Sequence, residues 1–180
     1  MMVRSRQTLG EAHRRLIAGW AADCANRVLS NFEAANPDDP RPRYAIERAW
    51  AFSRGELSIS EEIRRRFADS GAAREANTKA AAAAARAAGH AAAVCHMGAH
   101  ALGAAGYAAK SAGLSSLDYP VGSMDEIQWQ LSRMSPEVRA ALQLLPPVGE
   151  DRSGPLGPGL LASGEVGAAI RALQKAIQER

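Results

Sequence analysis

Apolar residues recur every three or four positions along most of this chain, with polar residues between them. That period is typical of α-helices that bury one face. The first such stripe consists of Leu16, Trp20, Cys24, Val28 and Phe32. Thr8 and Glu11 precede it with the spacing of a capping box, so we predict a helix over residues 9–36. Three prolines between residues 36 and 42 then require a loop, because proline cannot continue a helix.

Shorter apolar stripes predict further helices as far as residue 145. A second helix should begin at Pro40 and bury Ile46 and Trp50. A third should bury Ile63 and leave the arginines of residues 64–66 outside. Two short helices should lie between residues 123 and 145, one opened by a capping box of Ser123 with Glu126 and one by Ser135.

Residues 79–111 are rich in alanine, the strongest helix former, and we predict one long central helix there. Alanine brings little apolar area, so the helices must approach closely and a few large side chains must fill the core. We expect these to be Trp20, Phe32, Trp50, Phe67, Tyr107 and Trp129. Residues 87–109 lack charged side chains but are too weakly apolar to span a membrane, so we expect no membrane association. The predicted fold is an all-α bundle of about six helices.

The composition changes after residue 145. Residues 146–164 contain four prolines and five glycines without a periodic pattern, which predicts a mobile linker. A C-terminal amphipathic helix over residues 165–180 should follow, because one face is lined by Val166, Ile170, Leu173 and Ile177. We therefore divide the chain into a bundle domain of residues 1–145, this linker and this helix. A helix this short is marginal alone, so its stripe either docks on its own bundle or joins a second copy in a homodimer.

Charge and cysteine content narrow the class of protein. The formal net charge is +3 and the pI is about 9.2, which permits an acidic partner without demanding nucleic acid. Cys24 and Cys95 fit buried free thiols of a reducing compartment, because a secreted disulfide scaffold would hold more cysteine. No apolar run follows the first arginines, so we expect no signal peptide and a cytoplasmic protein. The sequence contains no glycine-rich phosphate loop or nucleophile elbow, and we expect no cofactor.

Three histidines form the most suggestive cluster. His96 and His100 are four residues apart, so their rings should leave the same face of a helix, with His90 within about a third of the circumference. Imidazoles one turn apart can chelate zinc, and a third ligand would then be a carboxylate such as Asp23. The alternative is that the histidines are hydrogen-bonded polar residues inside the bundle.

Two further sets of polar residues lie earlier in the chain. Asp23 and Arg27 have the spacing of an intrahelical ion pair beside Trp20, which predicts either a recognition site or only a surface pair. Asp38 and Asp39 precede Arg41 in the proline-rich loop. These carboxylates either bind a cation or a partner's arginine, or serve as a helix cap and a turn residue.

Several segments together resemble the bacterial domain family called immunity protein five-like, across residues 9–145. They are Trp20-Ala-Ala-Asp-Cys-Ala-Asn-Arg-Val-Leu, Asn36-Pro-Asp-Asp-Pro-Arg-Pro-Arg with Trp50, Ala87-Ala-Gly-His-Ala-Ala-Ala, and His96-Met-Gly-Ala-His-Ala-Leu-Gly-Ala-Ala with Tyr107. The resemblance implies a helical, non-enzymatic protein that binds and neutralises a toxin of a polymorphic toxin system. Its recurring polar positions match Trp20, Asp23, Arg27, Asp38, Asp39, Arg41, His90, His96 and His100.

Our hypothesis is that these nine residues converge on one cleft between the first, second and fourth predicted helices, where buried polar groups must satisfy one another or bind something. Two other functions stay open at this point. One is a metal-dependent hydrolase that uses His96, His100 and a carboxylate. The other is a helical nucleic-acid-binding protein that uses the arginines of residues 64–66.

Overall fold

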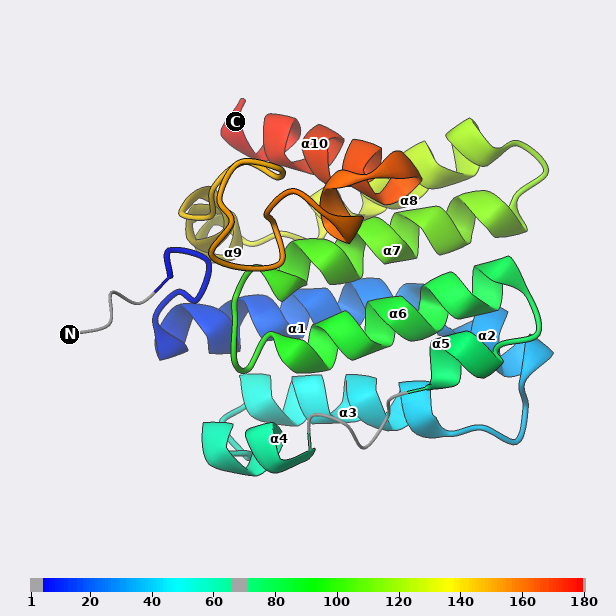
Figure 1. The fold of residues 1–180 in the computed structure, drawn as a ribbon, viewed down its shortest axis with the longest axis horizontal. Coiled ribbons are helices and arrows are strands. Elements are labelled where there is room, and N and C mark those ends of the chain that lie inside the picture. Colours follow the sequence, from blue (N-terminus) through cyan, green and yellow to red (C-terminus); the bar gives the residue numbers. More distant parts are fainter. Residues whose placement is uncertain (1–4, 66–70, 180) are drawn as a thin grey trace.

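Helices form all of the regular secondary structure in the described part of the chain, which confirms the predicted all-α bundle (Figure 1). The computed structural model describes residues 5–65 and 71–179, so the expected positions of Arg66 and Phe67 lie outside the described residues. The first half of the bundle consists of α1 (Glu11–Arg27), α2 (Leu29–Ala35), α3 (Arg41–Ser53), α4 (Ile59–Arg65), α5 (Ala72–Glu75) and α6 (Lys79–Ala93). The second half consists of α7 (His100–Ser115), α8 (Tyr119–Ser132), α9 (Pro136–Gln143), a 3-10 helix (Leu160–Ala162) and α10 (Gly164–Gln178).

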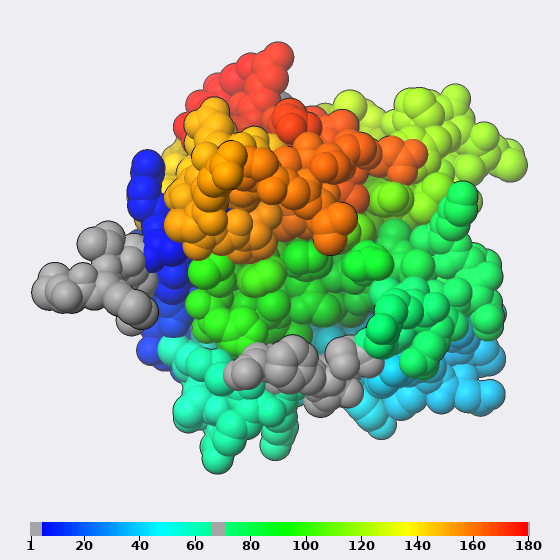
Figure 2. Space-filling model, viewed as in Figure 1, coloured from blue at the N-terminus to red at the C-terminus, as the bar shows by residue number. Residues whose placement is uncertain are grey.

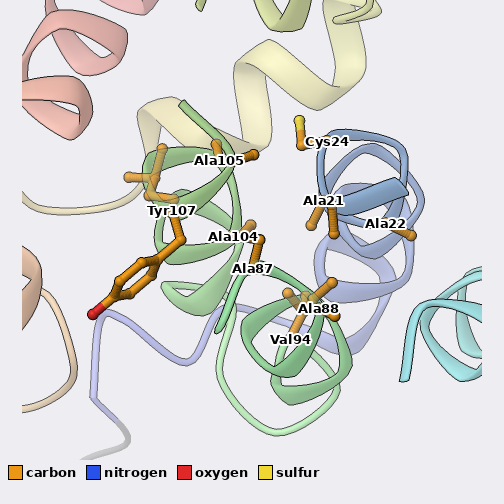
Figure 3. Packing of buried hydrophobic residues seen from close by; sticks show 14 of the residues in the cluster. Ala21, Ala22, Cys24, Ala87, Ala88, Val94, Ala104, Ala105 and Tyr107 are labelled. Atoms are coloured by element: carbon orange, nitrogen blue, oxygen red, sulfur yellow. The ribbon is translucent and has the colours of Figure 1, made fainter. Parts of the chain in front are cut away.

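The antiparallel pair α6 and α7 forms the centre of the bundle. Helix α1 packs against both of them, α3 packs against α6, and α8 and α10 pack against α7 (Figure 1). Alanines of α1, α6 and α7 meet in the core, and Ala21, Ala87 and Ala104 are fully buried (Figure 3). The small side chains thus give the close helix contacts that the composition predicts.

The prediction of one long alanine-rich helix is wrong, because α6 ends at Ala93 and α7 begins at His100. The turn between them is held by the segment before α1: the amides of Gly98 and Ala99 donate to the carbonyls of Thr8 and Gln7, both at 3.0 Å. Gly98 also lies so close to that segment that a Cβ would be 2.7 Å from Leu9 Cδ1. Long-range contacts therefore override the local helix preference of alanine. Among the described residues, no helix combines the length and apolar character that crossing a membrane requires.

Two other boundaries differ from the prediction. The first predicted helix is divided at Val28 into α1 and α2. Helix α8 begins earlier than Ser123, because the side chain of Asp118 caps it by accepting a hydrogen bond of 3.3 Å from the amide of Val121. Ser135 caps α9 as predicted, through the amide of Val138 at 3.2 Å.

The chain after α9 lies against the bundle. The buried side chain of Gln7 donates to the carbonyl of Asp151 (2.7 Å) and accepts from the amide of Leu156 (2.8 Å). Leu156 itself is fully buried. Helix α10 then packs on α7, α8 and α9 of its own chain, and its whole apolar stripe is buried. In this structure the stripe therefore docks on its own bundle.

Candidate functional site

The residues of α1 singled out by the sequence have partners on other helices. Asp23 accepts a hydrogen bond from the indole Nε1 of Trp50 on α3 (2.9 Å). The predicted Asp23–Arg27 pair is therefore wrong: the Nε of Arg27 lies 3.3 Å from Oε2 of Glu126 on α8. Trp20 is buried, and its Nε1 donates to the carbonyl of Gln130 (3.0 Å). These contacts join α1 to α3 and α8, so they stabilise the bundle.

His90 and His100 form the closest pair of imidazoles. Their Nδ1 atoms are 2.9 Å apart, and the His90 ring also stacks on Tyr107 with 5.4 Å between ring centroids. His96 lies in the turn between α6 and α7, with its Nδ1 3.2 Å from the sulfur of Cys95. The predicted shared face of His96 and His100 is thus wrong, because the helix that would place them one turn apart is interrupted.

Both members of the histidine pair are neutral at pH 7. Burial, and to a smaller extent the charge of Arg86, lowers the pKa of His90 to about 4. Burial also lowers the pKa of His100 to about 3, with contributions from His90 and His96. One ring therefore donates and the other accepts in the bond between them. Within residues 5–65 and 71–179, no three His, Cys, Asp or Glu residues are grouped so that they could hold a metal ion.

Gly89 and Gly103 offer a pair of alanine substitutions with opposite expected signs. A Cβ on Gly89 would meet no atom within 4 Å, whereas one on Gly103 would lie 2.6 Å from Nδ1 of His90. We expect Gly89→Ala to raise the free energy of unfolding by about 0.5–1 kcal/mol, because alanine favours a helix over glycine. We expect Gly103→Ala to lower it by about 1–3 kcal/mol, because the His90 ring must move. Urea unfolding checks both values, and a Gly103→Ala variant as stable as the parent would contradict the close contact.

The proline-rich loop and the start of α3 form a charged depression of about 560 Å³. Arg41 binds both oxygens of Asp39, with Nε 2.9 Å from Oδ1 and Nη2 2.7 Å from Oδ2, and its Nη2 also contacts Oε2 of Glu75. Hydrogen bonding from Arg41 holds the pKa of the Asp39 carboxyl below its usual value. Asp38 lines the depression and is exposed.

A second depression, of about 740 Å³, shares Pro40 and Arg41 with the first. It continues along α3 past Tyr44, whose side chain is 53% exposed. We call this continuous region the α3 surface; it is formed by Asp38, Asp39, Pro40, Arg41, Tyr44, Glu47, Arg48, Ala51, Arg54, Arg65 and Glu75. Tyr44 was not among the predicted site residues. Its position on the polar face of an amphipathic helix was the available signal, since an aromatic residue is unusual there.

Glu62 of α4 was not predicted either, and it is only 2% exposed. Its Oε2 accepts from Nε of Arg48 (3.2 Å), whereas its Oε1 has no hydrogen-bond partner among the described residues. Glu62 and His96 line the same small cavity of about 30 Å³, which is large enough for one water molecule. Nothing in the sequence distinguishes this buried carboxylate from the neighbouring Glu61.

These contacts divide the nine predicted site residues among separate sets of partners instead of joining them around one cleft. All nine lie within residues 7–137, the part of the chain that matches a family model described as "Imm-5 like putative immunity protein". The chain belongs to the Imm-5 like immunity protein family. The searches of curated proteins and of solved structures found no match to the chain. Family membership therefore covers α1 to the start of α9, and leaves the C-terminal segment and α10 outside the match.

Proposed function

We propose that this chain neutralises a cognate bacterial toxin by binding it stoichiometrically, without catalysing a reaction, and that the α3 surface is the site of contact. The observation that carries the proposal is the union of two depressions at Pro40 and Arg41, inside the region that matches the immunity family. An exposed tyrosine beside arginines is the composition of the residues that dominate binding at protein interfaces.

Hydrogen bonds and ion pairs within the chain restrain the loop and the arginine at one end of the α3 surface. Asn36 and Asn77 join the start of the proline-rich loop to the segment before α6. Oδ1 of Asn36 accepts a hydrogen bond from the amide of Asn77 (3.1 Å), and Nδ2 of Asn77 donates to the carbonyl of Ala35 (2.8 Å). Arg41 is fixed by two carboxylates, as described above. Preorganisation of this kind lowers the entropy lost on binding.

The charges of the α3 surface indicate the kind of partner that it fits. The α3 surface holds four arginines and four carboxylates, and the carboxylates of Asp38, Asp39 and Glu75 lie at the end formed by the first depression. A toxin surface that carries charges of both signs would complement it, whereas a uniformly basic cleft of a nuclease would be repelled by the arginines of the second depression. The buried free thiols Cys24 and Cys95 support a cytoplasmic location for this encounter, since a reducing compartment keeps such thiols unpaired.

The geometry of residues 5–65 and 71–179 does not favour the hydrolase alternative over this proposal. His96 and His100 have different partners, and burial raises the pKa of the Cys95 thiol to about 12, so that it stays protonated and is a poor nucleophile. Co-expression with the protein encoded beside it tests the function: a toxic neighbour whose effect on growth is relieved by this chain supports immunity. Relief without a complex of defined stoichiometry would contradict the binding mechanism.

Tyr44→Ala is expected to weaken binding of that toxin by about 10- to 100-fold, because a truncated interface tyrosine typically costs about 2 kcal/mol. Isothermal titration calorimetry with the purified toxin measures the change. The matched control is Val121→Ala on α8, a side chain that is 52% exposed and lies outside the α3 surface. Equal affinities for the two variants would exclude the α3 surface as the site of contact, while leaving immunity itself to the growth assay.

A further inference from the structure

A groove runs along the outer side of α6 and α7. Its first part, of about 350 Å³, lies between these helices and the start of α10, and Lys79, Arg86 and Lys110 are among its lining residues. Its second part, of about 330 Å³, lies between His90 and the C-terminal segment of residues 154–161. Arg86 and Tyr107 line both parts, so the two depressions adjoin each other, and we call them together the α6–α7 groove. Figure 2 shows the C-terminal segment (orange) lying beside α7 (green) on this side of the molecule.

The first part of the α6–α7 groove carries excess positive charge. Its three cationic side chains are opposed by one carboxylate, that of Glu165, which lies 3.4 Å from Nζ of Lys110. Neither Lys79 nor Arg86 takes part in an ion pair within the described residues. Cations gathered in a concave surface without matching counter-charges attract an anion.

The second part of the groove is aromatic and apolar. The Tyr107 ring points away from the alanine contacts of the core (Figure 3). It stacks on the ring of His90. Pro155, Leu160 and Leu161 complete the lining from the C-terminal segment. The histidine pair adds no charge here at neutral pH, as shown above. A depression of this size and lining suits one planar ring, because small-molecule pockets combine apolar walls with a few placed polar groups.

We propose that the α6–α7 groove binds a small organic anion, namely a planar ring that carries a phosphate or carboxylate group. The ring occupies the second part of the groove, which Tyr107 and His90 line on one side and the C-terminal segment on the other. The anionic group lies between Lys79 and Arg86. Part of the lining comes from residues outside the family match, so this site is not a consequence of family membership and is independent of toxin binding at the α3 surface.

Calorimetry on the full chain at low salt, with phenyl phosphate and benzoate as probes, tests the proposal. We expect at least one of them to bind with a Kd on the order of 1 mM or tighter, as a ligand of this size can. Comparison of the two probes distinguishes a phosphate from a carboxylate ligand. Inorganic phosphate and phenol, which each supply half of the ligand, should bind at least about tenfold more weakly than phenyl phosphate.

Ala82→Glu gives the decisive variant, with Ala82→Gln as its isosteric control. Ala82 lines the charged part of the groove, three residues after Lys79 and four before Arg86, so a glutamate there can pair with both cations. We expect Ala82→Glu to weaken the probe that binds by about tenfold or more, and Ala82→Gln to leave its affinity within about twofold. Lys79→Gln, at an exposed position, should reproduce the loss if the larger side chains at residue 82 disturb folding.

Three results would overturn the proposal. Neither ring-bearing probe binds at concentrations well above its expected Kd; Ala82→Glu and Lys79→Gln both bind the probe as well as the parent does; or an oligoglutamate peptide binds in the groove and neither small probe does. The last result would assign the groove to an acidic peptide.

Discussion

Leu173→Ala is expected to lower the free energy of unfolding by about 3 kcal/mol, within the range of about 2–5 kcal/mol typical of buried leucines. Leu173 is fully buried on the face of α10 that packs on α7, α8 and α9. The neighbouring contact is close: a Cβ on Gly106 of α7 would lie 2.9 Å from Cγ1 of Ile170. A cavity left at residue 173 cannot be filled by small shifts where helices are already in such contact, so the cost should be near the middle of the range.

Urea unfolding followed by circular dichroism measures this loss. The control is Leu160→Ala, because Leu160 is 78% exposed and its truncation should change stability by less than about 0.5 kcal/mol. If the two variants lose the same small amount, α10 does not dock as the structure has it. Light scattering on the parent and on Leu173→Ala also tests the homodimer, which stays a prediction: a dimer that only the parent forms would support pairing through α10.

The sequence predicted the helical class because the spacing of apolar and polar residues along the chain is a local property. It could not predict the break between α6 and α7. The segment between the two helices contains one glycine and no proline, so no strong local signal ends the helix there. The contacts that hold the turn come from Thr8 and Gln7, some ninety residues earlier. The prolines and glycines after residue 145 correctly indicated that α9 ends there. They could not indicate that Leu156 is buried, because its position depends on the hydrogen bond between its amide and Gln7.

The candidate site shows the same division. Asp39 and Arg41 are two residues apart, so their contact follows from local geometry, whereas Glu75 joins them only through the fold. His90 pairs with His100 because α6 and α7 form a helical hairpin. The prediction of one continuous helix instead placed His96 and His100 on the same face. Tyr44 is a candidate contact residue because it is exposed. Its exposure depends on how the neighbouring helices pack, which the sequence alone does not show.

The histidine pair makes the free energy of unfolding depend on pH between about 5 and 6.5, where most carboxylates are already ionised. Both folded-state pKa values, about 4 for His90 and about 3 for His100, lie below the ordinary histidine value of 6.5. The unfolded chain therefore takes up protons first as the pH falls, and stability is fully present above pH 6.5 and is lost on acidification. The charged and titratable groups near the pair are Arg86, Tyr107 and His96, and the charges of Arg86 and His96 oppose protonation of the pair.

Between pH 7 and pH 5 we expect the free energy of unfolding to fall by about 2 kcal/mol for each histidine of the pair, or about 4 kcal/mol together. The second proton is especially costly, because two imidazolium rings would place two Nδ1–H donors against each other at 2.9 Å. Urea unfolding at a series of pH values measures the slope. His100→Gln should remove about half of it, while His13→Gln, which removes an exposed histidine of α1, should leave it unchanged. A parent protein whose stability is constant from pH 7 to pH 5 would show that the two rings are not buried as a neutral pair.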